Sequence, residues 1–309
     1  MLSPTQPYAA VEAISYEPWL AKQVVVSVLR LDQFFPQLSG NKYFKLKHNL
    51  SHAQAQGYSR VISFGGAYSN HIHALAYAAQ QYGMQALGII RGDHGYAANP
   101  TLSDAQAWGM QLQFVSRSEY KRRAEPEYVR SLQQQYPDAW VIPEGGSNAL
   151  AVQGCAEIAE HIRQGLGDNF DTVLLPCGTG ATLAGVAMGL PPSKQVLGVA
   201  VLKGEGYLEA EVQRYLAQVA NNSHAKWQIC HDYHGGGYAK CDVALARFIN
   251  NFPIALEPVY SGKLFFALDA MINSAAIAPG SRIVLIHTGG MQGLRGMQAI
   301  MDKRLAAAD

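Results

Sequence analysis

Short runs of β-branched and other apolar residues alternate along the chain with longer segments of helical period. Strands are predicted at 24–30, 60–64, 85–91, 111–116, 140–142, 172–175, 196–202 and 283–286. Helices are predicted at 72–82, 101–108, 120–136, 183–190, 208–219, 262–274 and 294–305. Strands that alternate with helices are typical of parallel sheets covered by helices on both faces. The pattern therefore predicts an α/β protein with open, mostly parallel sheets.

Glycine-rich turns follow several of the predicted strands, where ligands of parallel sheets bind. The turn at 176–180 joins a strand to a helix, so its N–H groups and nearby threonine hydroxyls favour a phosphate. No Gly-Lys-Ser/Thr follows, which argues against a Walker loop. The strand at 196–202 does not end in an acidic residue, which argues against a dinucleotide site. Tight packing of helix on strand without a ligand is the alternative interpretation.

A second turn, at 65–71, places two glycines before Ser69, Asn70 and His71. Capping alone explains Ser69 or Asn70, because both are common at helix N-termini. Capping does not explain the two glycines and the polar triplet together. Free N–H groups beside short polar side chains would bind a carboxylate, such as that of an amino acid.

Three lysines occur within six residues at 42–47, and only Lys42 directly follows a Ser-Gly-Asn turn. That turn predicts a helix start, with Lys42 in the first turn at the positive end of the helix. An ammonium group is disfavoured there, so its pKa should fall, and the neutral amine is the form that reacts with aldehydes. A solvated surface lysine is the simpler interpretation of Lys42 taken alone. The phosphate and carboxylate turns elsewhere in the chain favour a pyridoxal phosphate site instead.

Composition narrows the class of protein. The 309 residues carry a net charge of +1 with histidine neutral, which gives no case for a nucleic-acid or anionic membrane surface. The four cysteines show no C-x-x-C spacing, so we expect reduced thiols and a cytoplasmic location. Residues 1–19 lack the pattern of a signal peptide, and no apolar run is long enough to span a membrane.

Histidines allow a metal site as a weaker hypothesis. His71 and His73 are two residues apart at a helix start, where they do not share a face. Cys230, His231 and His234 lack a second set of ligands at a familiar spacing. We therefore expect no metal.

The ordered motifs resemble those of pyridoxal-phosphate-dependent enzymes with the tryptophan synthase β-subunit fold. Within that group the chain is similar to the 1-aminocyclopropane-1-carboxylate (ACC) deaminase and D-cysteine desulfhydrase family. The resemblance covers nearly the whole chain, in the segments 39–46, 64–71, 142–148, 178–185, 237–238, 258–260 and 287–290. It implies a large domain of residues 1–45 and 145–309, a small domain of residues 46–144, pyridoxal 5'-phosphate in the cleft between them, and a homodimer.

The resemblance also implies roles for individual residues. Lys42 would bind the aldehyde of the cofactor and move the Cα proton, Asn70 would contact the ring hydroxyl, and Tyr260 would stack on the ring. Ser69 would hold the substrate carboxylate and relay a proton, with Asn70, His71 and Tyr238 facing the substrate. The phosphate would be held by Gly178, Thr179, Gly180, Ala181 and Thr182.

One departure from the family bears on the substrate. ACC deaminases resemble one another in carrying Glu after the stacking tyrosine and Leu before the late Gly-Gly pair, whereas this chain has Ser261 and Thr288. By resemblance Ser261 would meet the pyridine nitrogen. A hydroxyl there gives a weaker electron sink than a carboxylate, which suits loss of a good leaving group better than opening of a cyclopropane. The sequence therefore favours β-elimination from D-cysteine.

Other functions stay open at this stage. Within the same scaffold, the chain could be an ACC deaminase or another small-amino-acid dehydratase, desulfhydrase or racemase. From other classes, it could be a non-catalytic protein that holds pyridoxal phosphate, or a nicotinamide oxidoreductase. A small amino acid is the expected partner in the leading interpretation.

Overall fold

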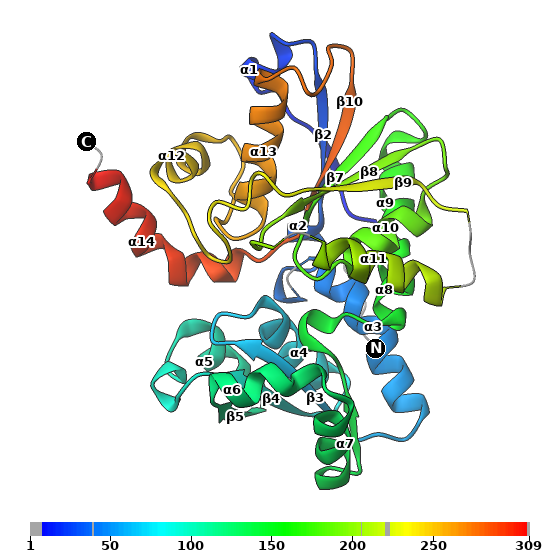
Figure 1. The fold of residues 1–309 in the computed structure, drawn as a ribbon, viewed down its shortest axis with the longest axis vertical. Coiled ribbons are helices and arrows are strands. Elements are labelled where there is room, and N and C mark those ends of the chain that lie inside the picture. The colour runs from blue at the N-terminus through cyan, green and yellow to red at the C-terminus, as the bar shows by residue number, and fades with distance from the viewer. Residues whose placement is uncertain (1–7, 39, 205, 220–222, 308–309) are drawn as a thin grey trace.

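The computed structural model describes residues 8–38, 40–204, 206–219 and 223–307. These residues form two halves, each built from one sheet with helices packed against it (Figure 1). Within these residues, the larger sheet has the strand order β1-β2-β10-β7-β8-β9, and only the β1–β2 pair is antiparallel. Its strands are β1 Val11–Ala13, β2 Val25–Arg30, β7 Thr172–Cys177, β8 Gln195–Ala200, β9 Lys226–Cys230 and β10 Arg282–His287. The smaller sheet is parallel throughout, in the order β5-β4-β3-β6. Its strands are β3 Arg60–Gly66, β4 Gln85–Arg91, β5 Met110–Val115 and β6 Ala139–Val141. The predicted α/β class with mostly parallel sheets is confirmed.

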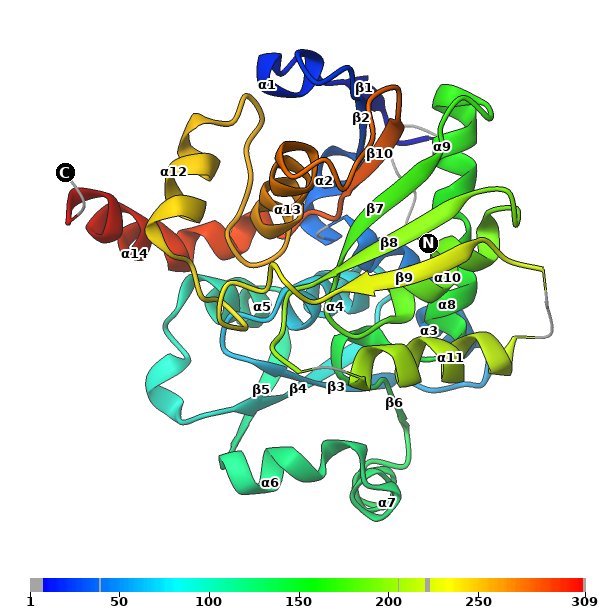
Figure 2. The same ribbon diagram turned by 45° about the horizontal axis from the view of Figure 1, so that its top comes forward.

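Helices cover both faces of the larger sheet, as Figures 1 and 2 show. Val173 and Leu175 of β7 pack with α8–α11, while Leu174, which points to the opposite face, packs with α12–α14. The helices of this half are α1 Glu17–Leu20, α2 Leu31–Phe34, α8 Ala149–Ala156, α9 Ile158–Leu166, α10 Ala181–Gly189, α11 Tyr207–Gln218, α12 Val243–Asn251, α13 Ser261–Asn273 and α14 Leu294–Ala306.

The smaller sheet is covered in the same way. Val61 of β3 packs with α3–α5, and its neighbour Ile62 packs with α6 and α7 on the other face. The helices here are α3 Asn41–Ala55, α4 Asn70–Gln81, α5 Pro100–Ala107, α6 Arg117–Lys121 and α7 Pro126–Gln135. No helix among the described residues combines the length and the apolar character needed to cross a membrane.

Most predicted elements are present within one to three residues of their predicted bounds. The helix predicted at 120–136 is wrong, because it is broken into α6 and α7 around Pro126. Glu125, the residue before this proline, is extended (φ −70°, ψ 127°), since the proline ring disfavours a helical conformation there. Strand β9 was not predicted, because its alternating pattern of polar and half-buried residues is typical of a sheet edge.

Helix α3 runs from one sheet system to the other. Near its start, a Cβ atom added at Gly154 of α8 would lie 1.9 Å from the carbonyl oxygen of Phe44, so the two backbones are in direct contact. Further along, Leu46 and Leu50 pack in the core of the smaller sheet. The predicted domain boundary at 45/46 falls inside this helix, and the domain boundaries stay a prediction.

Candidate active site

A cavity of about 500 Å³ lies between the two sheet systems. Its walls include the carboxyl ends of strands from both sheets and the first turns of α3, α4 and α10. Among the residues proposed from sequence, those that line it are Lys42, Ser69, Asn70, His71, Gly178, Thr179, Gly180, Thr182, Tyr238, Tyr260 and Thr288. Ala181 and Ser261 do not line it. The glycine turns predicted to bind a ligand thus meet around one cavity, although they are far apart in sequence.

Lys42 lies in the first turn of α3, whose start is set by close contact with the end of β10. Gly40 has φ +63°, and a Cβ atom on it would lie 2.5 Å from the carbonyl oxygen of Thr288. Asn41 donates a backbone hydrogen bond of 3.3 Å to the same oxygen. Glycine is therefore needed at position 40 both for its backbone conformation and for lack of space. Ser39, the residue before it, lies outside the described residues.

The Lys42 amine lies in the wall of the cavity and donates a hydrogen bond of 3.1 Å to Oδ1 of Asn41. Loss of water lowers its pKa to about 7, and the nearby charge of Lys45 contributes. The expected lowering of the pKa is found, but burial rather than the helix end is its main cause. A substantial fraction of this amine is therefore neutral and nucleophilic near pH 7.

The turn after β7 forms an anion cradle at the start of α10. Gly180 precedes the helix with φ +80°, and its position lets the first N–H groups of α10 face the cavity. Two side chains of α3 reach this turn: Asn41 Nδ2 donates to Thr182 Oγ1 (2.9 Å), and Lys45 Nζ donates to Thr179 Oγ1 (3.2 Å). The lysine helix and the cradle, which are 141 and 134 residues apart in sequence at these two contacts, thus form one unit.

Lys45 is a candidate functional residue that sequence reasoning missed. It is almost fully buried, and its ammonium group donates to three neutral oxygens, the carbonyl oxygen of Gly145 (3.0 Å) and the hydroxyls of Ser147 (3.0 Å) and Thr179. Burial lowers its pKa. No carboxylate of the described residues pairs with it, so a bound phosphate would supply the missing opposite charge. The spacing of three residues from Lys42, which puts both lysines on one helix face, was the available signal.

The turn at 65–71 leads into α4 as predicted, with Ser69 as its N-cap. Ser69 Oγ accepts a hydrogen bond of 3.3 Å from the N–H of Ile72. The N–H groups of Asn70 and His71 have no acceptor among the described residues, which leaves two donors at the positive end of the helix. This arrangement fits a carboxylate.

Asn70 also ties the smaller half to the larger one. Its Oδ1 accepts a hydrogen bond of 2.7 Å from Gln292 Nε2, and a Cβ atom at Gly290 would lie 2.5 Å from its Nδ2. With the oxygen occupied, Nδ2 remains to donate into the cavity. That donor suits an oxygen acceptor such as the ring hydroxyl of the cofactor, so the predicted role is compatible with the geometry and stays a prediction.

His71 is buried and held by Ser63, whose Oγ lies 2.8 Å from Nε2. Its Nδ1 is buried without a partner among the described residues, and burial, with the charges of Lys42 and Lys45, lowers its pKa well below the usual range. His71 is therefore neutral at pH 7. Its role in substrate binding stays a prediction.

Two tyrosines, Tyr238 and Tyr260, form another part of the cavity wall. The ring centroids of Tyr238 and Tyr260 lie 6.3 Å apart at an interplanar angle of 73°. A Cβ atom at Gly178 would lie 3.4 Å from Tyr260 Cε1, so the Tyr260 ring borders the anion cradle. Loss of water and nearby negative charge raise the pKa of Tyr260 well above its usual value, so its hydroxyl is protonated at neutral pH.

Ser261 and Thr288 differ in their access to the cavity. Ser261 is fully buried and bonded to Glu257, whose N–H donates to Ser261 Oγ (2.9 Å). Thr288, at the end of β10, lines the cavity. Thr288 thus has the surface that contact with a ligand requires. The predicted contact between Ser261 and the pyridine nitrogen stays a prediction.

Glu257 is a second residue that sequence reasoning passed over. Its carboxylate accepts hydrogen bonds from the N–H groups of Val259 (2.7 Å), Tyr260 (2.7 Å) and Ser261 (2.6 Å) and is almost fully buried. Burial raises its pKa, whereas these hydrogen bonds lower it. The carboxylate therefore shapes the turn that presents Tyr260.

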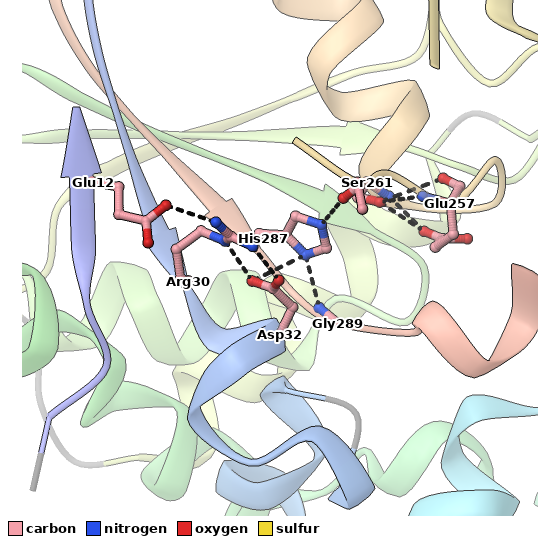
Figure 3. A network of polar contacts seen from close by, with 8 residues as sticks. Glu12, Arg30, Asp32, Glu257, Ser261, His287 and Gly289 are labelled. Carbon is pink, nitrogen blue, oxygen red and sulfur yellow. Dashed lines mark hydrogen bonds and ion pairs between the residues drawn. The ribbon is translucent and has the colours of Figure 1, made fainter. Parts of the chain in front are cut away.

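A polar network around Arg30, Asp32 and His287 is shown in Figure 3. Arg30 Nη1 pairs with Glu12 (2.6 Å) and Nη2 with Asp32 (2.7 Å). His287 Nδ1 lies 3.6 Å from Asp32, its Nε2 lies 3.0 Å from the carbonyl oxygen of Ala255, and the N–H of Gly289 lies 3.3 Å from Nδ1. This network fixes the end of β10, against which Gly40 rests.

The residues considered for metal binding have other partners. His73 Nε2 lies 3.0 Å from Asp104, and His231 Nε2 lies 2.6 Å from Glu209. Cys230 and His234 likewise have local partners. Within the described ranges, no group of three potential ligands is arranged around one point.

Comparisons with known proteins agree with this geometry. The sequence pattern described as "pyridoxal-phosphate dependent enzyme" matches residues 17–289. The chain is 30% identical to a mitochondrial bifunctional D-cysteine desulfhydrase/1-aminocyclopropane-1-carboxylate deaminase of Arabidopsis thaliana, over 84% of this chain and 70% of that one. It is 27% identical to a D-cysteine desulfhydrase of Klebsiella pneumoniae, over 83% and 84% of the two chains. A crystal structure of an ACC deaminase homologue shares the fold, with a TM-score of 0.83 at 24% identity, over 96% of this chain and 94% of that one. The chain therefore belongs to the family of pyridoxal-phosphate dependent enzymes.

Proposed function

We propose that this protein is a lyase that removes a β-substituent from a small amino acid, with D-cysteine as a substrate and pyruvate, ammonia and sulfide as products. The observation that carries the proposal is the meeting of three parts around one cavity. These are the Lys42 amine, the anion cradle before α10 and the free N–H groups at the start of α4. The relatives named as D-cysteine desulfhydrases support the choice of substrate.

Each part of the cavity has a chemical task in this proposal. Bound pyridoxal phosphate supplies an electron sink for negative charge at the substrate Cα. Lys45 and the cradle at 178–182 hold the phosphate group, and the N–H groups of Asn70 and His71 hold the substrate carboxylate. Lys42 Nζ takes the Cα proton, for which a pKa near 7 is well suited. Tyr238 and Tyr260, with protonated hydroxyls, enclose the opposite side.

Elimination is favoured over cyclopropane opening because, in the part of the chain that the structure describes, no free carboxylate lies beside Thr288. Glu257 is a buried acid near that wall, with its carboxyl carbon 3.8 Å from a Cβ atom at Gly290. Its oxygens are already bound by three backbone N–H groups. Thr288 offers a neutral hydrogen bond at the cavity wall, which supports a weaker electron sink than a carboxylate would. ACC deaminase activity is the second candidate, favoured by the name of the bifunctional relative.

The test is an assay of the purified holoenzyme with a panel of D- and L-cysteine, D- and L-serine, β-chloroalanine and ACC. We expect sulfide and pyruvate from D-cysteine and little 2-oxobutyrate from ACC. Lys42→Ala should abolish turnover. Formation of 2-oxobutyrate from ACC without sulfide from D-cysteine would favour the deaminase. No product from any amino acid would support a non-catalytic role.

Assembly and location belong to the same proposal. We propose a homodimer in the cytoplasm. The described cysteines are all free thiols, which supports a reducing compartment. Sedimentation analysis and fractionation of the source cells test these two points.

A further inference from the structure

Two arginines reach the cavity from the smaller half. Arg91 is the last residue of β4, and Arg117 is the first residue of α6. Both are exposed residues that line the cavity, together with Arg123 and Glu144. They therefore stand at the entrance, where a substrate that enters from solvent meets them.

The charge of these two arginines is not balanced by any carboxylate of the described residues. Among the described residues, no carboxylate lies within ion-pair distance of Arg91 or Arg117. Arg91 lies over the face of Tyr120, with 5.5 Å between its Cζ and the ring centroid. Arg123, by contrast, pairs with Glu144 (2.5 Å), which also accepts a hydrogen bond from Tyr120. Glu144, an acidic residue in the cavity wall, is thus already neutralised.

Arg91 lies next to the expected position of the substrate. A Cβ atom at Gly66 would lie 3.5 Å from Arg91 Nη2, so the guanidinium group rests over the glycine turn that precedes Ser69. Its positive charge also acts on Tyr238 across the cavity, where it lowers the pKa of the hydroxyl against the raising effect of burial. The guanidinium group therefore lies beside the glycine turn that leads to the carboxylate site.

The charges needed for the cofactor and for an α-carboxylate are present without these arginines. Lys45 and the start of α10 serve the phosphate, and the N–H groups at the start of α4 serve the carboxylate. Two guanidinium groups remain at the cavity wall, and a guanidinium group can bind an oxyanion through paired hydrogen bonds.

We propose that the preferred substrate is an amino acid whose β-substituent is an oxyanion, a phosphate ester or a sulfonate, held by Arg91 and Arg117. This deepens the proposed function and rests on it. In the reaction, Lys42 takes the Cα proton and the Cβ–O or Cβ–S bond breaks. The electron pair leaves with phosphate or sulfite, and water then converts the released aminoacrylate to pyruvate and ammonia.

Steady-state kinetics of the holoenzyme with O-phosphoserine and cysteate, each as D and L forms, test the proposal against D-cysteine. We expect kcat/KM for at least one oxyanion substrate to exceed that for D-cysteine by 10-fold or more. The double variant Arg91→Gln/Arg117→Gln should lose about 10- to 100-fold on that substrate, the size of one or two charge-assisted hydrogen bonds. The loss on D-cysteine, which carries no oxyanion on Cβ, should be several-fold smaller than the loss on the oxyanion substrate.

Arg122→Gln is the matched control, since this arginine lies outside the cavity and pairs with Glu125. This variant also removes one arginine charge, and it should change kcat/KM for neither substrate. Equal losses on both substrates in the double variant, or no preference for an oxyanion in the wild type, would overturn the proposal. Preference for the phosphate over the sulfonate, or the reverse, identifies the leaving group.

Binding measurements separate this inference from the proposed function. By calorimetry, holoenzyme should bind O-phosphoserine at least 10-fold more tightly than serine, and the double variant should lose that difference. Equal affinities would overturn the inference even if D-cysteine is turned over. If no amino acid gives product yet the difference in affinity is present, the proposed reaction fails and the oxyanion site stands.

Discussion

The N–H of Asn41 donates a hydrogen bond to the carbonyl oxygen of Thr288, which joins the start of the Lys42 helix to the end of the central strand β10. Gly40 makes this contact possible, because any side chain would collide with that oxygen. The position of the reactive amine is thus set by backbone contact between segments nearly 250 residues apart in sequence.

Gly40→Ala should therefore destabilise the protein by more than about 2 kcal/mol, the strain of a left-handed alanine plus the collision. Gly57→Ala is the matched control at the other end of the same helix, with φ +77° and no atom within 4 Å of the added Cβ. It should cost only about 1 kcal/mol. Urea unfolding of both variants measures the difference, and equal costs would contradict the role of the Thr288 contact.

Capture of pyridoxal phosphate by the apoenzyme should accelerate as pH rises through about 7. The neutral amine is the reacting form, and its fraction grows as pH passes the lowered pKa of Lys42. Because the charge of Lys45 lowers that pKa, Lys45→Met should move the midpoint to higher pH and also weaken cofactor affinity. Stopped-flow absorbance across pH 6–9 provides the rates.

Lys47→Met is the control for charge in the same helix. This lysine pairs with Glu157 and does not line the cavity. Its removal should leave the midpoint in place. A midpoint shift as large as that of Lys45→Met would show that the effect is general to the helix.

Part of the acid sensitivity of the protein should come from His161. This buried histidine accepts a hydrogen bond of 2.9 Å from the N–H of Ala9 at Nδ1, and burial lowers its pKa from 6.5 to about 4. For a base with a lowered folded-state pKa, the stabilisation is present above about pH 6.5 and is lost as pH falls towards 4. The shift corresponds to about 3 kcal/mol.

His161→Gln keeps an acceptor for the N–H of Ala9 without a titrating group. Urea unfolding at pH 7, 5.5 and 4 should show that the wild type loses stability relative to this variant as pH falls. Parallel profiles for the two proteins would exclude His161 as a source of the acid sensitivity.

Glu257→Gln should cost about 2–4 kcal/mol and weaken cofactor binding. An amide retains one acceptor oxygen, and its NH₂ group would face backbone N–H groups that now lose their partner. Ser261→Ala removes a hydroxyl from the same turn and should cost only about 1 kcal/mol. Thermal unfolding of apoenzyme gives the stability, and fluorescence titration with pyridoxal phosphate gives the affinity. A Glu257→Gln variant as stable as the wild type would show that the turn does not need the charge.

Sequence reasoning located the strands and the glycine turns because their signals are local. Hydrophobic period places β4 at Gln85–Arg91 as predicted, and the glycine turn predicts where α10 begins. The break at Pro126 was also readable, since proline restricts its own residue and the one before it. The break was missed because the periodic pattern of apolar residues continues on both sides of the proline.

The partners of the site residues could not be predicted in the same way. Lys45 acquires its three oxygen partners from residues 100–134 positions away in the sequence. Such contacts depend on how the two sheet systems are placed, which no local pattern encodes. The unbalanced charge of Arg91 likewise emerges only when the cavity is assembled.

The Lys42 amine lies on helix α3, and the first turns of this helix contact the larger half at Gly154, Thr182 and Thr179. If the smaller half moves during turnover, Lys42 and the anion cradle at 178–182 therefore keep their positions relative to each other. The distances from Lys42 to the start of α4 and to Arg91 and Arg117, which belong to the smaller half, would change instead. The substrate-binding side of the cavity could thus open and close while the position of the Lys42 amine relative to the turn at 178–182 stays the same.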